Sequence, residues 1–446
     1  MEKFEFGTNI IDKVLNELDK ARKYIKIVVF QIHNEDIINK LIEKAKKGIS
    51  VEIITLPYES IYDNTQNAQE HIIGKLNELE NAGANIYICN WNLGDTSHTK
   101  TVPGPWHNLH LKFIVTDKMA MALSANLISN EDIDAMFIRN DRRDTEEFNK
   151  KFESIKSDYI DNNVIDKIKE KITDKDILKE ILTPPEHLDK NQKSILHYPI
   201  DLCPDMIEIE EKLYIFPFDC RGRDFIKKII DDAQEYVYLS TERFTDKEMF
   251  YFLQKSKFKG KEIKVLTKFQ SQDYQYDIIQ FAKNCLSTGI ILKDNKLVHA
   301  KLIITDKLVA LGSINLNQMN LGFIPKKGFW RSNTEAMIIC KNKEIINRAK
   351  SLFLGIFNNS KDIINNLIKK EVDNFKKIAK EVLGMPLYNC GEYLAEKYLK
   401  DETRDRKKCL DILIEAGKLA KAKNLKKINE DLIRAAENNL MYQKKL

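Results

Sequence analysis

Hydrophobic residues follow two alternating spacings along the first 90 residues of the chain. Apolar side chains at Ile10, Val14 and Leu18 recur with the helical period, and residues 24–32 (YIKIVVFQI) form a β-rich apolar run that is typical of a buried strand. The same order then repeats, which predicts helices over 36–47 and 66–82 and strands over 50–56 and 85–91. Strands that alternate with helices of this length indicate an α/β fold, with a parallel or mixed sheet covered by helices.

A second region of the chain repeats this alternation. It predicts helices over 224–233, 247–257 and 274–287, with strands over 236–240, 262–267 and 290–292. Residues 158–200 are polar and predict a largely helical linker, and after residue 359 only helical spacing remains, over 361–383, 391–400, 406–423 and 425–442. We therefore predict an α/β domain over 1–157, a helical linker over 158–204, a second α/β domain over 205–358 and an all-helical C-terminal subdomain over 359–446.

Two segments of the chain match each other without a gap. HLKFIVTDKMAMALSANL begins at His110, and HAKLIITDKLVALGSINL begins at His299, 189 residues later. Further downstream, the Ala-Met pair that follows Asp134 matches the pair that follows Glu335. A long-period self-match of this kind indicates duplicated domains.

The residues shared by the two copies suit a phosphate site. A histidine and a lysine at i and i+2 point to the same face of a strand, where lysine can neutralise phosphoryl oxygens and histidine can attack phosphorus or protonate a leaving oxygen. A serine and an asparagine follow on the neighbouring strand as candidate hydrogen-bond donors to phosphate, and a carboxylate that begins a further strand could hold the histidine Nδ1 proton. These candidates are His110, Lys112, Ser124, Asn126 and Asp134 in the first copy, and His299, Lys301, Ser313, Asn315 and Glu335 in the second.

The repeated pattern resembles the phospholipase D superfamily, whose signature is H-x-K-x(4)-D-x(6)-G-S-x-N. The second copy carries every residue of this signature, including Asp306 and Gly312, with five residues between these two where the signature has six. The first copy includes Asp117 but has Leu123 where the signature has glycine, which would hinder a close approach of the backbone to phosphate. The resemblance covers residues 1–157 and 205–358.

This resemblance implies two duplicated phospholipase D-like α-β-α sandwich domains with mixed sheets, paired so that both motifs meet in one cleft. It implies a phosphohistidine intermediate: one histidine attacks phosphorus and the other protonates the leaving group, with no metal ion or other cofactor. We expect His110 to be the nucleophile and His299 the acid, although the duplication leaves the reverse assignment open. Asp117 and Asp306 are expected to have a supporting role away from the phosphate.

Charge and cysteine usage narrow the class of protein. The net charge is +5, and from residue 360 onward 20 basic residues stand against 14 acidic ones, so the basic excess belongs to the C-terminal part. That part either contacts nucleic acid or an anionic surface or simply presents a solvated helical face. The seven cysteines include no C-x-x-C pair, which favours reduced thiols over a disulfide framework or a zinc site. No apolar run approaches the roughly 20 residues of a membrane span, and the N-terminus lacks a signal-peptide pattern, so we expect a cytoplasmic protein.

The motif specifies the bond that is cleaved better than the molecule that contains it. We favour a nuclease that acts on DNA or RNA, because the C-terminal part and the segment 139–143 (RNDRR) are basic. Restriction or phage defence is a setting suggested by family analogy alone. The first alternative is a lipid phosphodiesterase or phosphatidyltransferase. The second is a phosphate-binding assembly module without catalysis, whose helical tail binds a protein partner or forms a homodimer.

Overall fold

The computed structural model describes most of the chain in two compact units. The described residues are 2–55, 66–90, 109–129, 131–157, 193–196, 208–216, 219–268, 285, 288–322, 333, 335–387, 390–391, 393–395 and 406–443. The first unit comprises Met1–Lys268 and Asn295–Asn358, and the second comprises Phe269–Asp294 and Asn359–Leu446. Both copies of the repeated motif lie in the first unit.

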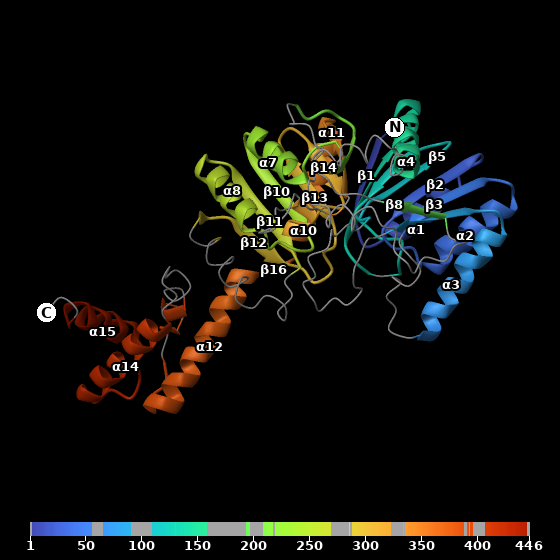
Figure 1. Cartoon of the computed structure of the whole chain (residues 1–446). Helices are drawn as coiled ribbons and strands as arrows, with labels where there is room; N and C mark the ends of the chain where they lie inside the picture. Colours follow the sequence, from blue (N-terminus) through green and yellow to red (C-terminus); the bar gives the residue numbers. More distant parts are fainter. Residues whose placement is uncertain are drawn as a thin grey trace, which may run out of the picture. The chain divides into compact units, whose positions relative to one another are not determined.

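The first half of unit 1 contains a mixed sheet with the strand order β1-β7-β6-β5-β2-β3-β4-β8 (Figure 1). Strands β2, β3, β4 and β8 are parallel, whereas β1, β7, β6 and β5 pair antiparallel. The strands are β1 (Glu2–Gly7), β2 (Tyr24–Val29), β3 (Ser50–Thr55), β4 (Asn85–Asn90), β5 (Lys112–Thr116), β6 (Ala120–Leu123), β7 (Asp134–Arg139) and β8 (Lys193–Leu196). The helices are α1 (Ile10–Leu18), α2 (Glu35–Lys46), α3 (Gln66–Asn81) and α4 (Arg142–Ser157).

Side-chain alternation along the strands builds one core on each face of this sheet. In β2, Ile25 and Ile27 point into a core formed with the apolar sides of α1, α2 and α3, while Val28 points into a different core on the opposite face. Helix α4 contributes Phe148 to that opposite core, where its ring packs edge-on against Phe113 of β5 at 5.6 Å between ring centres. The period of two along a strand therefore explains why both faces are apolar and both are covered.

The second half of unit 1 repeats this arrangement. Within unit 1, the strands of its sheet follow the order β11-β10-β13-β14-β15-β9, so that β10, β13, β14 and β15 occupy the places of β2, β5, β6 and β7. The strands are β9 (Leu213–Phe216), β10 (Tyr236–Thr241), β11 (Glu262–Thr267), β13 (Lys301–Thr305), β14 (Val309–Gly312) and β15 (Glu335–Cys340). The helices are α7 (Gly222–Asp232), α8 (Lys247–Phe258), α10 (Gln318–Leu321) and α11 (Lys343–Asn358). The predicted duplication of an α/β fold is confirmed.

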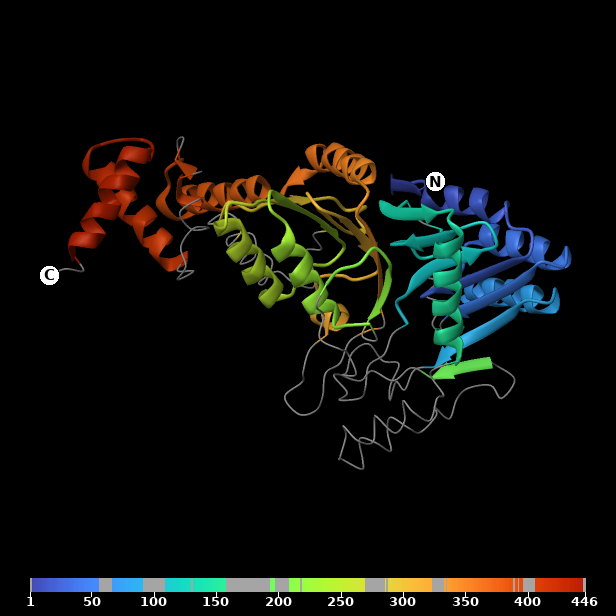
Figure 2. The ribbon, with the colours of Figure 1, turned by 90° about the horizontal axis from the view of Figure 1, so that it is seen from above.

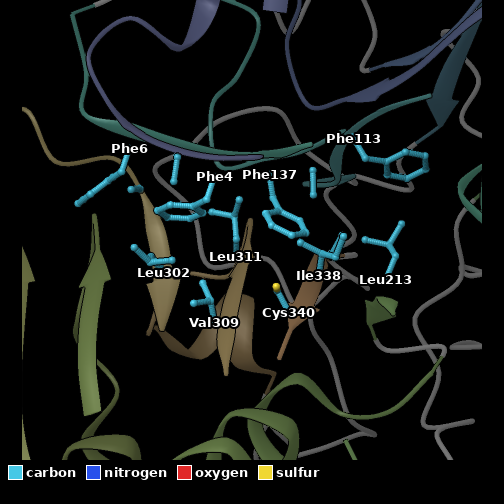
Figure 3. Packing of buried hydrophobic residues seen from close by; sticks show 14 of the residues in the cluster. Phe4, Phe6, Phe113, Phe137, Leu213, Leu302, Val309, Leu311, Ile338 and Cys340 are labelled. Atoms are coloured by element: carbon cyan, nitrogen blue, oxygen red, sulfur yellow. The ribbon is translucent and has the colours of Figure 1, made fainter. Parts of the chain in front are cut away.

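The two sheets pack against each other through one shared hydrophobic core. Phe4 and Phe137 of the first sheet face Leu311 and Ile338 of the second (Figure 3), and all four are at most 1% exposed. Burying a large apolar side chain contributes roughly 1.5–3 kcal/mol, so this cluster is enough to hold the two halves in one relative position. The fixed packing is what brings the two copies of the motif together.

Unit 2 contains the antiparallel pair β12 (Ile291–Asp294) and β16 (Lys361–Asp362), together with α12 (Ile363–Leu383), α14 (Arg406–Ala422) and α15 (Glu430–Gln443). In Figure 2, α14 and α15 are the red helices near the C-terminus. Phe375, Leu413 and Ile433 are among the residues that form its own core. The predicted helices of the C-terminal part are confirmed where they are described. Helix α15 begins later than the predicted residue 425, because Asn424 has a φ of 53° and the side chain of Asn429 accepts the backbone N–H of Leu432 at 3.1 Å.

Some elements differ from the prediction. Strands β1 and β9 were not predicted, since they are short edge strands without a long apolar run. Four residues of the expected helical linker, Lys193–Leu196, instead form β8 beside β4, where pairing with a neighbouring strand overrides local helical preference. The rest of that linker, most of the helix predicted over 274–287 and most of that over 391–400 lie outside the described residues.

Two further expectations concern cysteines and membrane spans. Within the described part, Cys220, Cys285, Cys340, Cys390 and Cys409 are buried free thiols, as predicted. Among the described helices, none has the length and apolar character needed to cross a membrane.

Candidate active site

Backbone pairing between the two halves positions one of the motif histidines. Ile133, directly before β7, donates its N–H to the carbonyl of Leu297 at 2.6 Å and accepts the N–H of His299 at 3.0 Å. This short bridge crosses from the first half to the second. It fixes His299, just ahead of β13, beside Asp134, the first residue of β7.

Each motif histidine is bound by a carboxylate of the other half. Nδ1 of His110 lies 2.9 Å from Oε2 of Glu335, and Nδ1 of His299 lies 2.9 Å from Oδ1 of Asp134. The carboxylates fix the orientation of both rings and leave Nε2 as the ring nitrogen available for chemistry. The candidate active site is therefore built from residues of both halves, and neither half alone contains a histidine together with its carboxylate partner.

The serines contact these carboxylates. Ser124 Oγ donates to Asp134 at 2.6 Å and accepts the N–H of Ala135 at 2.8 Å, and Ser313 makes the equivalent bonds to Glu335 and Ala336. Both serines follow the ends of β6 and β14 instead of lying on those strands. Their hydroxyl protons are already engaged, so the geometry gives them a role in orienting the carboxylates in place of the expected contact with phosphate.

The asparagines lie next to the serines and differ from each other. The amide oxygen of Asn315 accepts bonds of 3.3 Å from both Thr241 Oγ1 and the N–H of Arg243. The amide oxygen of Asn126 is buried and has no hydrogen-bond partner among the described residues. Asn320 of α10, which sequence reasoning missed, donates to the second carboxylate oxygen of Glu335.

Two lysine ammonium groups are buried in the same site. Lys112 and Lys301 are each 1% exposed. Lys112 Nζ donates to the carbonyl of His110 at 2.9 Å, whereas Lys301 Nζ makes no hydrogen bond to any residue that the structure describes. Burial and the neighbouring charge of Lys301 lower the pKa of Lys112 to about 7, and burial also lowers the pKa of Lys301. Two buried ammonium groups with few hydrogen-bond partners have the charge and the free donors that an anion would need.

The ionisable groups around the two histidines are not equivalent. Burial, Lys112 and Lys301 hold the pKa of His110 well below its usual value, which favours the neutral ring. Burial raises the pKa of its partner Glu335 to about 8. Burial acts in the same direction on Asp134, but the charge and hydrogen bond of His299 outweigh it and lower the pKa of Asp134. His110 thus lies beside a carboxyl group that burial tends to neutralise, and His299 beside an ionised one.

The residue that follows β10 is charged and the equivalent residue after β2 is aromatic, which makes the difference between the two histidine environments larger. Glu242, directly after β10, places Oε2 at 3.6 Å from Nε2 of His299 and 3.7 Å from Nζ of Lys301. The equivalent residue after β2 is Phe30, whose ring packs edge-on against His110 at 5.1 Å between ring centres and lies 5.6 Å from the ammonium of Lys112. Sequence reasoning missed both residues. Aligning the two strands that precede them, YIKIVV and YVYLST, would have placed Phe30 opposite Glu242.

The comparisons with known proteins agree with this geometry. The family model described as "Cardiolipin synthase, PLD-like domain" matches residues 14–156 and 226–357, which is more than half of the chain. The chain belongs to the phospholipase D-like family. A search of the curated proteins finds no match.

Several solved structures are similar to this chain at low sequence identity. Phosphatidylserine synthase of Haemophilus influenzae is 12% identical, with a TM-score of 0.56 over 94% of both chains. Polyphosphate kinase of Porphyromonas gingivalis is 11% identical, with a TM-score of 0.46 over 79% of this chain, which spans only 46% of that enzyme's length. Nuc of Salmonella typhimurium, a phospholipase D family member, is 19% identical, with a TM-score of 0.28 over 34% of this chain and 95% of its own. The duplicated phospholipase D-like fold is thus established by the family match and by the first of these structures.

The glycine of the phospholipase D signature has a packing role here. A Cβ on Gly312 would lie 1.9 Å from the carbonyl oxygen of Ala336, a contact too short for any side chain. In the first half, Leu123 occupies the matched position and packs into the core beneath α1, α2 and α3. The departure from the signature therefore concerns strand packing, and His110 and Lys112 of the first copy keep their places in the candidate site.

The signature aspartates lie away from the histidines. Asp117 Oδ1 accepts the backbone N–H groups of Arg22 and Lys23 at 2.8 and 3.1 Å. Asp306 accepts those of Gln234 and Glu235 at 2.9 and 3.2 Å. Each aspartate ties the loop after the motif strand to the start of the neighbouring strand, which agrees with a supporting role.

Arg139 and the group formed by Asp132, Asp134 and His299 are charged groups whose bonds limit what they can bind. Arg139 was expected to contact nucleic-acid phosphates, but it is 3% exposed and bonds to Asp144 at 3.0 Å, Glu211 at 3.1 Å and the carbonyl of Ile339 at 2.8 Å, so it is not available. Asp132, Asp134 and His299 place ligand-type atoms within 4.8 Å of one another. Since the facing atoms of Asp134 and His299 are hydrogen-bonded to each other, we assign no metal site to this group.

Proposed function

We propose that this chain cleaves phosphodiester bonds without a metal ion, through a phosphohistidine intermediate in the site shared by its two halves. The observation that supports this most directly is the pairing of two buried lysines with two histidines whose Nδ1 atoms are both bound by carboxylates. The lysines would neutralise the phosphoryl oxygens, which favours the charge that develops in the transition state. The Nε2 atoms, which are not held by the carboxylates at Nδ1, would face phosphorus and the leaving oxygen from opposite sides.

We further propose that the substrate is a nucleic acid. Residues 421–427 (KAKNLKK), which include the end of α14 and the turn that follows it, are all exposed, and they include four lysines and no acidic residue. A lysine-rich exposed turn of this kind favours association with a polyanion such as a DNA or RNA backbone. This basic turn supports binding and contributes no catalytic group.

A second candidate is a phosphatidyl transfer or phospholipid cleavage reaction. The matching family model is described as a cardiolipin synthase domain, and the phosphatidylserine synthase of Haemophilus influenzae shares the fold over 94% of both chains. The chemistry at phosphorus would be the same, with an alcohol or water accepting the phosphatidyl group. Only the molecule that enters the site would differ.

The test is cleavage of supercoiled plasmid, single-stranded DNA and RNA in the presence of EDTA. We expect wild-type protein to cut at least one of these substrates and His110→Ala and His299→Ala to lose at least about a thousandfold in rate. The matched control is His71→Ala, because His71 lies on α3 and has a side chain that is 54% exposed and contacts Glu35. It should retain wild-type activity.

Vesicles containing phosphatidylglycerol and phosphatidylethanolamine distinguish the candidates. Release of headgroup from vesicles with no cutting of nucleic acid would replace the nuclease by the lipid enzyme. Inertness towards all substrates, with retained binding of inorganic phosphate, would favour a phosphate-binding assembly module. If only one histidine substitution abolished cutting, the site would not be shared between the halves.

A further inference from the structure

The pseudo-symmetry of the two halves is broken at one position beside the reacting nitrogens. The turns held by Asp117 and Asp306 show that Lys23 and Glu235 are equivalent, so Phe30 and Glu242, each seven residues later, are equivalent too. The strand registers agree with this equivalence. In the first half, Val29 pairs with Lys112, the first residue of the motif strand. In the second half, Ser240 pairs with Leu302, so the next step of this antiparallel register places Thr241, directly before Glu242, opposite Lys301. An aromatic ring thus contacts one histidine where a carboxylate faces the other.

We propose that Glu242 gives the two motif histidines different roles. Its carboxylate stabilises the protonated ring of His299, which acts as the proton donor, and His110 is left as the nucleophile. This proposal rests on the proposed phosphodiester cleavage. Glu242 acts through His299 and is a positioning residue, because its carboxylate contacts Nε2 of that ring at 3.6 Å.

Charges on both sides of the His299 ring support the assignment. Asp134 faces Nδ1 at 2.9 Å, and Glu242 faces Nε2, so a doubly protonated ring would have an anionic partner at each nitrogen. His299, Lys301 and the nearby Arg243 and Lys268 outweigh burial and lower the pKa of Glu242 to about 2, which keeps this carboxylate ionised. The charged and titratable groups that act on His299 or on its partners are Asp132, Asp134, Glu242, Lys301, His110, Lys112, Arg243 and Lys268.

The surroundings of His110 favour the opposite state. Its Nε2 has no hydrogen-bond or ion-pair partner among the described residues, and the ring of Phe30 packs against it where a carboxylate stands in the other half. Burial, Lys112 and Lys301 depress the pKa of His110 and outweigh Glu242, which acts on this ring in the opposite direction. A neutral ring with a free lone pair is the form that can attack phosphorus.

The resulting steps balance without any reactant besides substrate and water. The Nε2 lone pair of His110 forms a bond to phosphorus while the bond from phosphorus to the leaving oxygen breaks, and that oxygen takes the proton from Nε2 of His299. Water then attacks phosphorus and gives a proton to His299, and the electron pair of the phosphorus–nitrogen bond returns to His110. Between turnovers, Glu242 stabilises the restored proton on His299.

The first experiment locates the intermediate. Wild-type protein is quenched in acid-free denaturant during turnover of a short oligonucleotide with a single cleavable bond, digested, and analysed for phosphohistidine by mass spectrometry. We expect the modification in the peptide that contains His110. Modification of the His299 peptide would overturn the proposal while leaving phosphodiester cleavage intact.

The second experiment compares pH profiles of variants. An opposite charge within about 4–6 Å shifts a titration by about 1–3 pH units, so Glu242→Gln should move the alkaline limb of kcat to lower pH by at least about one unit. At pH 8.5 this is a loss of at least about tenfold in kcat, since one unit is a factor of 10. Glu242→Asp should restore part of the shift. A profile identical to wild type in Glu242→Gln would refute the role of the carboxylate.

The mirror position provides the matched control. Phe30→Glu should slow turnover because a carboxylate beside His110 favours its protonated, unreactive form. Phe30→Leu removes the same ring without adding charge, so its loss of activity should be at least about tenfold smaller than that of Phe30→Glu. Equal losses in both variants would contradict the argument.

A readout that needs no turnover keeps this test separate from the proposed function. In NMR spectra of 15N-labelled ring nitrogens at pH 7, the doubly protonated fraction of His299 should be smaller in Glu242→Gln than in wild type. If no phosphodiester is cleaved but this fraction falls, only the proposed function fails. An unchanged fraction would overturn the role of Glu242, whatever the substrate.

Discussion

Gly312 offers a sharp test of how strand packing supports the active site. It is the last residue of β14, pairs with Met337 of β15, and lies directly before Ser313. In Gly312→Ala, the new Cβ would meet the carbonyl oxygen of Ala336 at 1.9 Å and Cγ of Met337 at 2.7 Å. A backbone oxygen cannot rotate away, so β15 would have to move by about 1.5 Å to reach an ordinary contact distance.

The cost follows from the contacts that this movement disturbs. Overpacking a well-packed core costs typically about 1–3 kcal/mol. The bond from the N–H of Ser313 to Ala336 O, 2.9 Å long, would be broken, which adds about 1 kcal/mol. We therefore expect the free energy of unfolding to fall by about 2–4 kcal/mol. Because Glu335 precedes Ala336 and orients His110, activity should also fall by about a hundredfold.

The assay is urea unfolding followed by circular dichroism, with cleavage rates measured on the same preparations. The control is Gly355→Ala in helix α11, where a Cβ would have no neighbour within 4 Å. Alanine is a better helix former than glycine, so this control should be neutral or more stable by up to about 1 kcal/mol. If Gly312→Ala stayed within about 0.5 kcal/mol of wild type and kept full activity, the packing explanation of this glycine would be wrong.

Three further predictions concern charged groups. The N–H bonds from Arg22 and Lys23 outweigh burial and lower the pKa of Asp117, so this carboxylate stabilises the fold above its unfolded pKa and the effect is lost as the pH falls. In urea unfolding, Asp117→Ala should lower the free energy of unfolding by about 1–2 kcal/mol at pH 7 and by less than half of that at pH 3. An equal loss at both pH values would contradict this reasoning. The pKa of Lys112 is lowered to about 7, so its positive charge is lost as the pH rises. Calorimetry should therefore show that sulfate binds at least about tenfold more weakly at pH 8.5 than at pH 6. A sulfate affinity that does not depend on pH would exclude Lys112 as the anion ligand. Arg139→Met should reduce the free energy of unfolding by about 2–3 kcal/mol, because the partly buried carboxylates of Asp144 and Glu211 lose their arginine partner. The pH profile of cleavage should stay unchanged. A shifted profile would place this arginine in the active site.

Much of the architecture could be predicted from local patterns. The segments 24–32 and 236–240 read as strands because their apolar runs are β-branched or aromatic, and the structure has β2 and β10 there. The internal match of the two motif segments predicted a duplicated α/β fold, since constant spacing between chemically active residues survives only if both copies fold alike. Strand β8 could not be predicted, because its four residues form a strand only by pairing with β4.

The sequence by itself thus determined the order of elements, the duplication and the chemical groups of both motif copies. Only the tertiary structure decided their partners: His110 meets Glu335, 225 residues away, and His299 meets Asp134 of the opposite half. It also revealed Glu242, which no motif contains, and it showed that Arg139 is buried in an ion-pair cluster. The physical reason is that periodicity and spacing report which face of its own element a side chain occupies. Which charges lie within a few ångströms, and hence which protonation states are stable, depends on how the two sheets pack together.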